Sequence, residues 1–96
     1  MTSVFTDQKL HSITETLRAV GHPVRMQIIE MLHQEGPQTV KSIHEYLDLS
    51  QPVVSNHLRL LKDRSVVKSS RQGQNSIYQL CDERYHDVIL RIGELV

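Results

Sequence analysis

The sequence predicts a mainly α-helical domain with one β-hairpin, in the order helix, helix, helix, helix, hairpin, helix. Two observations support this prediction. Apolar residues recur at the three- or four-residue spacing of an amphipathic helix in five segments. Before the last segment, the runs VVKSSR and NSIYQL indicate two strands around the turn sequence Gln72-Gly73-Gln74. A chain of 96 residues suits a single domain, spanning residues 1–96.

Capping residues and glycines delimit the first two helices. Thr6 and Asp7 can begin the first helix, as N-cap and first-turn acid, and Gly21 ends it. Pro23 suits the first turn of the second helix, which the Gly36-Pro37 pair ends. The predicted apolar stripes are Leu10, Ile13, Leu17 and Val20 in the first helix, and Val24, Ile28, Ile29 and Leu32 in the second.

A very short connection joins the third and fourth helices. The third is predicted at about 39–48 and the fourth at about 51–64, so that only Leu49-Ser50 separates them. Ser50 is a good N-cap, and Pro52 is tolerated in the first turn because the amide there has no intrahelical acceptor. The inward residues are Val40, Ile43 and Leu47 in the third helix, and Val54, Leu58 and Leu61 in the fourth.

The hairpin occupies residues 66–80, and the last helix follows at 82–96 with Asp82 as its cap. Two helices joined by a tight turn and followed by a hairpin form a winged helix-turn-helix arrangement. The helix-turn-helix unit is then 39–64, and the wing is 66–80. The apolar stripe predicted for the last helix is Tyr85, Val88, Ile89, Ile92 and Val96.

The outward face of the 51–64 helix carries side chains that can read DNA. At about 100° per residue, Ser55, Asn56 and Arg59 fall opposite the inward stripe. A helix fits the major groove, where Asn and Gln can pair with adenine and Arg with guanine. Gln51 flanks the N-terminal end, whose free amides can bind a phosphate. The alternative is an ordinary solvated helix face, and the neighbouring turn and hairpin favour the DNA reading.

Basic residues concentrate in this part of a chain whose formal net charge is zero. Residues 50–80 carry five basic residues and only Asp63 as an acid, whereas 1–36 and 81–96 have an acidic excess. A local basic face suits a polyanion. Arg71, beside the hairpin turn, can contact a phosphate or the minor groove; the alternative is a charged tip that protects an edge strand. The predicted DNA contacts are Gln51, Ser55, Asn56, Arg59, Lys62, Lys68 and Arg71.

Three segments resemble the ArsR/SmtB transcriptional repressors. SQPVVSNHLRLLKDRSVV (50–67) resembles their recognition helix, LRAVGHPVRMQIIEML (17–32) their second helix, and RQGQNSIYQL (71–80) their wing. The resemblance implies a homodimeric winged-helix repressor that binds a palindromic operator in double-stranded DNA and is released by an inducer. It also implies that the first and last helices, at 1–20 and 82–96, form the dimer interface.

The residues support a dimer independently. The apolar stripes of the first and last helices lack an obvious cover in so small a chain, and a two-fold partner would bury them. A dimer would also place two recognition helices one DNA turn apart. The predicted interface residues are Leu10, Ile13, Leu17, Tyr85, Val88, Ile89 and Ile92.

The metal sites that the resemblance suggests are broken in this sequence. The thiolate site falls on Thr39, Lys41 and His44, none of which is cysteine. In the site of the last helix, Asp82 matches, but Arg84 and Leu95 stand at the histidine positions, and the final ligand position lies past Val96. We therefore expect no metal cofactor at these sites. A noncanonical cluster remains as a minor alternative, formed by His86, Asp82, Cys81 and His11.

Two of the other histidines have structural interpretations. His22 is interpreted as a helix cap or surface residue, and His57 as a packed, hydrogen-bonded residue. Cys81 is the single cysteine and is interpreted as buried or neutral, with a redox switch as the alternative. Because one cysteine forms no intramolecular disulfide, and because neither a signal peptide nor an apolar span is present, we expect a cytoplasmic protein.

The sequence offers no enzyme site: there is no phosphate-binding glycine loop, paired-carboxylate motif or nucleophile setting. It predicts a sequence-specific DNA-binding regulator. The alternative is a winged helix used only for protein–protein contact, which would leave the recognition face neutral or apolar.

Overall fold

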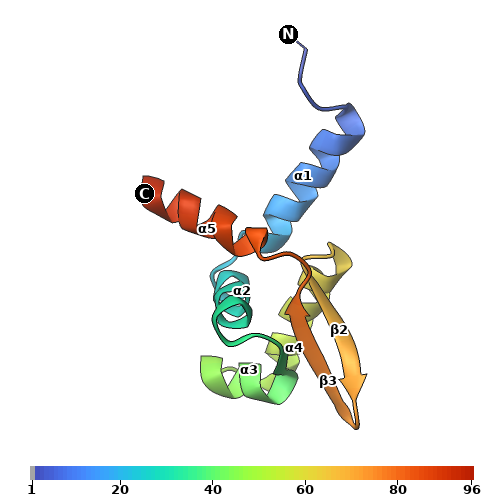
Figure 1. Cartoon of the computed structure of the whole chain (residues 1–96), viewed down its shortest axis with the longest axis vertical. Coiled ribbons are helices and arrows are strands. Elements are labelled where there is room, and N and C mark those ends of the chain that lie inside the picture. Colours follow the sequence, from blue (N-terminus) through green and yellow to red (C-terminus); the bar gives the residue numbers. More distant parts are fainter. Residues whose placement is uncertain (1) are drawn as a thin grey trace.

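The computed structural model describes residues 2–96, in which α2, α3, α4 and the hairpin form a body and α1 and α5 project from it (Figure 1). The N-terminus lies at the far end of α1, opposite the end that carries α3, α4 and the tip of the hairpin. The elements are α1 (Asp7–Val20), α2 (Pro23–Glu35), β1 (Gln38–Thr39), α3 (Val40–Leu47), α4 (Gln51–Asp63), β2 (Val67–Gln72), β3 (Asn75–Leu80) and α5 (Arg84–Leu95). This order confirms the predicted winged helix-turn-helix.

Side-chain caps begin four of the helices, as the sequence leads one to expect. Thr6 Oγ1 accepts the Lys9 amide at the start of α1, and Ser50 Oγ accepts the Val53 amide at the start of α4. His22 caps α2 through Nδ1, which confirms the capping interpretation of this histidine. These bonds satisfy amides that have no partner within the helix. The fourth cap is Thr39, at the start of α3.

Three details differ from the prediction. Thr39 lies in a short strand, β1, which pairs antiparallel with β3 and extends the hairpin to three strands in the order β1-β3-β2. The first strand of the wing begins at Val67, where pairing with Leu80 of β3 begins, and Val66 precedes it in the core. Glu83 stands at the N-cap of α5 without a side-chain cap bond, while Asp82 Oδ1 accepts the Arg84 amide (2.9 Å) one position earlier.

The core lies between α2, α3, α4 and the root of the hairpin, and α1 contributes little to it. Only Ala19 and Val20 at the end of α1 are buried. The core residues are Val20, Ile28, Ile29, Met31, Leu32, Ile43, Val54, Leu58, Leu61, Val66, Val67 and Leu80. The predicted inward stripes of α2, α3 and α4 therefore point into the body.

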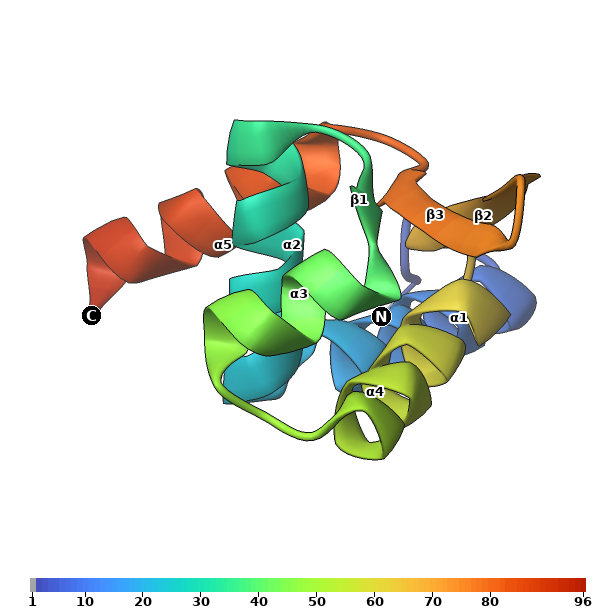
Figure 2. The ribbon, with the colours of Figure 1, turned by 90° about the horizontal axis from the view of Figure 1, so that it is seen from below.

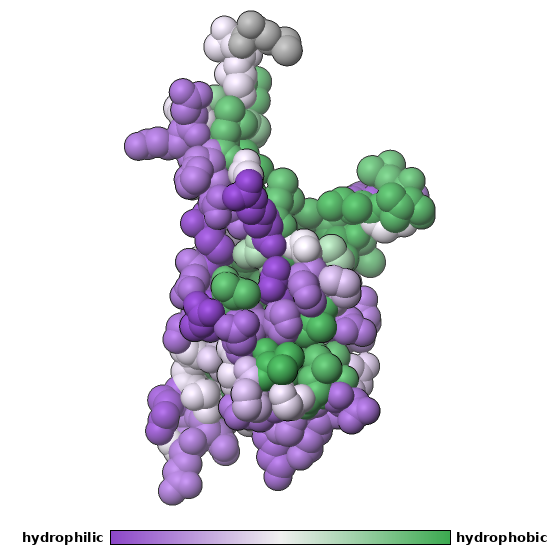
Figure 3. All heavy atoms as spheres, turned by 180° about the vertical axis from the view of Figure 1, so that it is seen from behind, coloured by the Kyte–Doolittle hydropathy of each residue, from purple (hydrophilic) through white to green (hydrophobic). Residues whose placement is uncertain are grey.

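Apolar side chains of α1 and α5 remain on the surface. Leu17 is 52% exposed, Val88 44% and Ile92 48%. Apolar surface follows the side of α1 that faces α5 and continues over α5 (Figure 3). A groove of about 230 Å³ between the two helices is lined by Ile13, Leu17, Val88 and their neighbours. Within residues 2–96, no helix is long and apolar enough to cross a membrane.

A strained residue connects α4 to the wing. Ser65 has φ of 58°, in the left-handed region that glycine favours, and its amide bonds to Lys62 O (2.9 Å). Gly73 has φ of 64° in the two-residue turn between Gln72 and Asn75, where its missing Cβ permits that conformation. A serine at such an angle costs free energy that a glycine would avoid.

We expect Ser65→Gly to raise the free energy of unfolding by up to about 1 kcal/mol, because relief of the left-handed strain exceeds the added chain entropy of glycine. Urea denaturation measures this, and Ser65→Ala, which keeps the Cβ, is the matched control. A glycine variant no more stable than the alanine variant would contradict the strain argument.

Candidate nucleic-acid interface

The turn before α4 fixes how that helix leaves α3. Asp48 ends α3 in the left-handed conformation (φ 55°), and the Leu49 amide returns to His44 O (3.1 Å). His44 Nδ1 also donates to Leu49 O (3.2 Å). In the sequence, His44 stands out only as a thiolate position without a cysteine; in the structure it is a hydrogen-bond donor that stabilises the turn. Seen from below, α3 and α4 lie at the surface beside the hairpin (Figure 2).

The buried stripe of α4 determines which side chains face outward. Val54, Leu58 and Leu61 are fully buried, and the opposite face of the 13-residue helix is turned to solvent. Gln51, Asn56, Arg59 and Lys62 are exposed there, whereas Ser55 is half-buried. The structure thus gathers the predicted α4 contacts on or beside one outward face of this helix, whose C-terminal end lies against α1.

The outward side chains are already joined to one another. Gln51 Nε2 donates to Ser55 Oγ (2.7 Å), and Arg59 Nη2 donates to Asn56 Oδ1 (2.8 Å). Arg59 Nη1 also pairs with Asp63 Oδ2 at 3.4 Å, and both side chains are about 60% exposed. An exposed pair of this kind is worth about 0–1 kcal/mol. The Asn56–Arg59–Asp63 network therefore orders the arginine while leaving it free to exchange partners.

The strand register separates the two basic residues predicted for the wing. Lys68 pairs with Gln79 and Arg71 with Ser76, three positions apart along β2. Because successive side chains alternate between the faces of a strand, Lys68 and Arg71 lie on opposite faces. Arg71 shares its face with Val67, which is buried against the body. Arg71 therefore lies on the side of the hairpin that faces the helices.

A cluster around His57 is the main feature that sequence reasoning did not foresee in full. Arg25 Nη1 donates to His57 Nδ1 (3.2 Å), so this nitrogen carries no proton in the observed arrangement. The His22 ring packs at 4.7 Å from the His57 ring, measured between centroids. Burial lowers the pKa of His57 below its usual 6.5, and the nearby His22 and Arg25 lower it further. The interpretation of His57 as packed and hydrogen-bonded is confirmed.

The minor metal candidates are not brought together. The guanidinium of Arg84 hydrogen-bonds the carboxylate of Asp82 and holds the pKa of Asp82 at about 2. His86 is buried and stacks on His33 at 4.0 Å between ring centroids, and Cys81 is exposed rather than buried. Across residues 2–96, no three His, Cys, Asp or Glu side chains gather closely enough to hold a metal ion. His11 lies on the exposed surface of α1.

Known proteins share this architecture and sequence. The family model described as a helix-turn-helix domain matches residues 20–70. An uncharacterised HTH-type transcriptional regulator of Methanocaldococcus jannaschii is 32% identical over 88 residues, covering 92% of this chain and 99% of that protein. The HTH-type transcriptional repressor SmtB of Mycobacterium tuberculosis is 36% identical over 81 residues, covering 84% of this chain and 59% of SmtB.

A solved structure supports the fold. A homodimeric winged helix-turn-helix DNA-binding domain from Mycobacterium bovis, described as a possible ArsR-family transcriptional regulator, has a TM-score of 0.83 at 22% identity, covering 97% of this chain and 91% of that one. The family model and the named relatives define the class: a DNA-binding transcriptional regulator, with the winged helix-turn-helix fold that the solved structure shares. Within that class, the chain belongs to the ArsR/SmtB family.

The environment of His57 predicts a loss of stability in acid. Since its pKa is lowered in the folded chain, the unfolded chain binds more protons once the pH falls below about 6.5. The contribution of His57 is complete above that pH and declines as the pH falls toward the lowered folded value. We expect the free energy of unfolding to fall between pH 7 and pH 5.5 by less in His57→Gln than in the wild type, because glutamine can still accept from Arg25 but does not titrate.

Urea denaturation across that pH range measures the difference. His11→Gln, which removes an exposed histidine of α1, is the matched control and should keep the wild-type slope. A His57→Gln variant that follows the wild-type pH dependence would rule out His57 as the titrating group.

Proposed function

We propose that the chain is a homodimeric repressor that binds a palindromic operator through α4 and the wing and leaves it when an inducer binds. The observation that carries this proposal is the presence of two distinct surfaces. One is the polar, basic outward face of α4. The other is formed by the uncovered apolar faces of α1 and α5, which project from the body at the end opposite α3 (Figures 1 and 3). Each surface needs a different partner, and a dimer on DNA provides both.

The dimer would form through residues 1–20 and 82–96. Leu10, Leu17, Val88 and Ile92 are exposed, and Ile13, Tyr85 and Ile89 are half-buried, which leaves area for a partner to cover. Burial of apolar area contributes about 25 cal/mol per Å². The Mycobacterium bovis domain is described as homodimeric, which supports a dimer for this chain.

Within the proposed helix-turn-helix unit, 39–64, α4 would enter the major groove. Asn56 and Gln51 have the groups that pair with adenine, and Arg59 the fork that pairs with guanine. Ser55 joins Gln51 and would hold its amide in place. Lys62 would contact phosphate from the C-terminal part of α4. In the proposed wing, 66–80, the register favours Arg71 over Lys68 as the phosphate contact.

A mobility-shift assay with the DNA upstream of the chain's own gene tests the proposal. We expect a specific shift that weakens with salt, together with a sedimentation mass of twice 11.1 kDa. The second candidate is a winged helix that contacts only protein, which the exposed Val53 on α4 favours. Absence of a specific, salt-sensitive shift would replace the first proposal with the second.

The two basic residues of the wing should differ in effect. We expect Arg71→Ala to reduce operator affinity about tenfold. The slope of log affinity against log salt concentration should fall by about 1 for each wing on DNA, because binding then releases about one counterion fewer per wing. Lys68→Ala, on the opposite strand face, is the matched control and should change both quantities much less. Fluorescence anisotropy at several salt concentrations measures both. Equal effects of the two variants would contradict the assignment of Arg71.

Asp63 should restrain DNA binding. Its carboxylate pairs with Arg59 and adds a negative charge next to Lys62, a proposed phosphate contact. We expect Asp63→Asn to strengthen operator binding by up to about fivefold, which corresponds to the worth of an exposed ion pair. Asp87→Asn, an exposed acid on α5, controls for the change in net charge. Unchanged or weaker binding of the Asp63 variant at low salt would contradict this role.

A further inference from the structure

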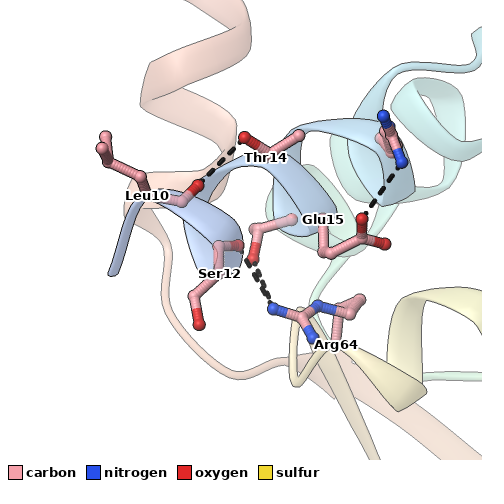
Figure 4. A network of polar contacts seen from close by, with 7 residues as sticks. Leu10, Ser12, Thr14, Glu15 and Arg64 are labelled. Carbon is pink, nitrogen blue, oxygen red and sulfur yellow. Dashed lines mark hydrogen bonds and ion pairs between the residues drawn. The ribbon is translucent and has the colours of Figure 1, made fainter. Parts of the chain in front are cut away.

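Arg64 connects the end of α4 to the middle of α1. It is the C-cap residue of α4, and its Nη2 donates to Ser12 O (3.2 Å) and Thr16 Oγ1 (3.4 Å) (Figure 4). The side chain is half-buried between the two helices rather than directed to solvent as a free charge. These contacts join residues 48 and 52 positions apart in the sequence.

Arg25 makes a second connection between the same two helices. From α2, its Nε donates to Ala19 O and its Nη2 to Arg18 O (3.3 Å), at the C-terminal end of α1. Its Nη1 donates to His57 Nδ1, in the middle of α4. Arg25 therefore joins the C-terminal end of α1 to the middle of α4, and Arg64 joins the middle of α1 to the C-terminal end of α4.

Few buried side chains fix the direction of α1 within the part of the protomer that the structure describes. Only Ala19 and Val20 of this helix are buried, so a rotation of α1 would have its pivot at the C-terminal end; Leu10 and Leu17 are exposed, and Ile13 is half-buried. Two fixed points along a rod determine its direction, and Arg64 supplies the one distant from the pivot. The arginines thus set the angle between the proposed dimerisation helix and the proposed recognition helix.

That angle has consequences on the scale of a base pair. The 14 residues of α1 span about 21 Å at 1.5 Å per residue. A rotation of about 10° at the pivot displaces the far end by about 3.7 Å, close to the rise of about 3.4 Å per base along a strand. In a dimer, the separation of the two α4 helices follows the same angle.

We propose that Arg64, with Arg25, is a positioning residue that sets the spacing of operator half-sites by holding α1 at a fixed angle to α4. The inference rests on the proposed function, because it requires a dimer that reads two half-sites. It assigns to Arg64 a role in choosing which operators fit, separate from direct contact with a base or phosphate.

The experiment uses duplexes that carry two copies of a half-site selected from random DNA by the wild-type protein, with the separation varied one base pair at a time. The wild type should prefer one separation by at least about tenfold over its neighbours, a difference of about 1.4 kcal/mol. We expect Arg64→Ala to reduce that preference to about threefold or to move the optimum by a base pair, while the protein remains dimeric.

Variants of α1 test the connection without changing any charge. Thr16→Val removes the hydroxyl that accepts from Arg64 and should weaken the spacing preference in the same direction. Thr14→Val is the matched control, because the Thr14 hydroxyl bonds only within α1, to Leu10 O (2.9 Å), and its variant should keep the wild-type profile (Figure 4). Thermal unfolding verifies that each variant folds, and Thr16→Val keeps the test valid should Arg64→Ala unfold.

The outcomes are distinct. A flattened or shifted profile for Arg64→Ala and Thr16→Val supports the inference. A uniform loss of affinity at every separation, or an unchanged profile, overturns it and leaves Arg64 with a stabilising or phosphate-binding role only. A wild-type protein that binds no DNA specifically overturns the proposed function itself.

Discussion

The packing of α4 through Val54, Leu58 and Leu61 is the constraint on which the rest of the structure depends. All three side chains are fully buried, and truncating a buried leucine costs about 2–5 kcal/mol. That cost is large beside the about 5–15 kcal/mol by which a domain is stable. Rotation of α4 about its axis would expose these residues, so their burial alone directs Asn56 and Arg59 outward. The candidate DNA surface is thus a consequence of the core.

Local signals were sufficient to predict most of the fold. Thr6, Ser50 and Pro23 mark helix starts because a capping hydroxyl or a missing amide acts within one helical turn. The inward stripe of α4 follows from spacing alone, and so does its outward face. The short strand β1 was not predicted, because two residues are too few to show the alternation of a strand. Gln38 and Thr39 form a strand only by pairing with β3.

Contacts between distant elements could not be predicted in this way. The sequence gives Arg25, His57 and Arg64 no mutual relation, because their partners lie far along the chain. The same holds for the stacking of His33 on His86, since the sequence grouped His86 with Asp82, Cys81 and His11 in a candidate metal cluster and gave no role to His33. Arg64 counted only as one of the basic residues, although its contacts show that its guanidinium is committed to α1. Charge counts therefore overstate the charge available to DNA.

The proposed dimer interface and the proposed DNA surface together explain why α1 packs so little on its own protomer. A helix that packs fully on its own protomer has no apolar face left for a partner. A helix that makes no contact with its protomer would not fix the position of α4 relative to the dimer interface. α1 lies between these limits: Ala19 and Val20 anchor it, Leu17 stays exposed, and Arg64 fixes its direction. Hydrogen bonds to backbone carbonyls hold an angle without using the apolar area that association needs. The polar side of α1 is thus connected to α4 by hydrogen bonds, while its apolar side stays available for a second copy of the chain.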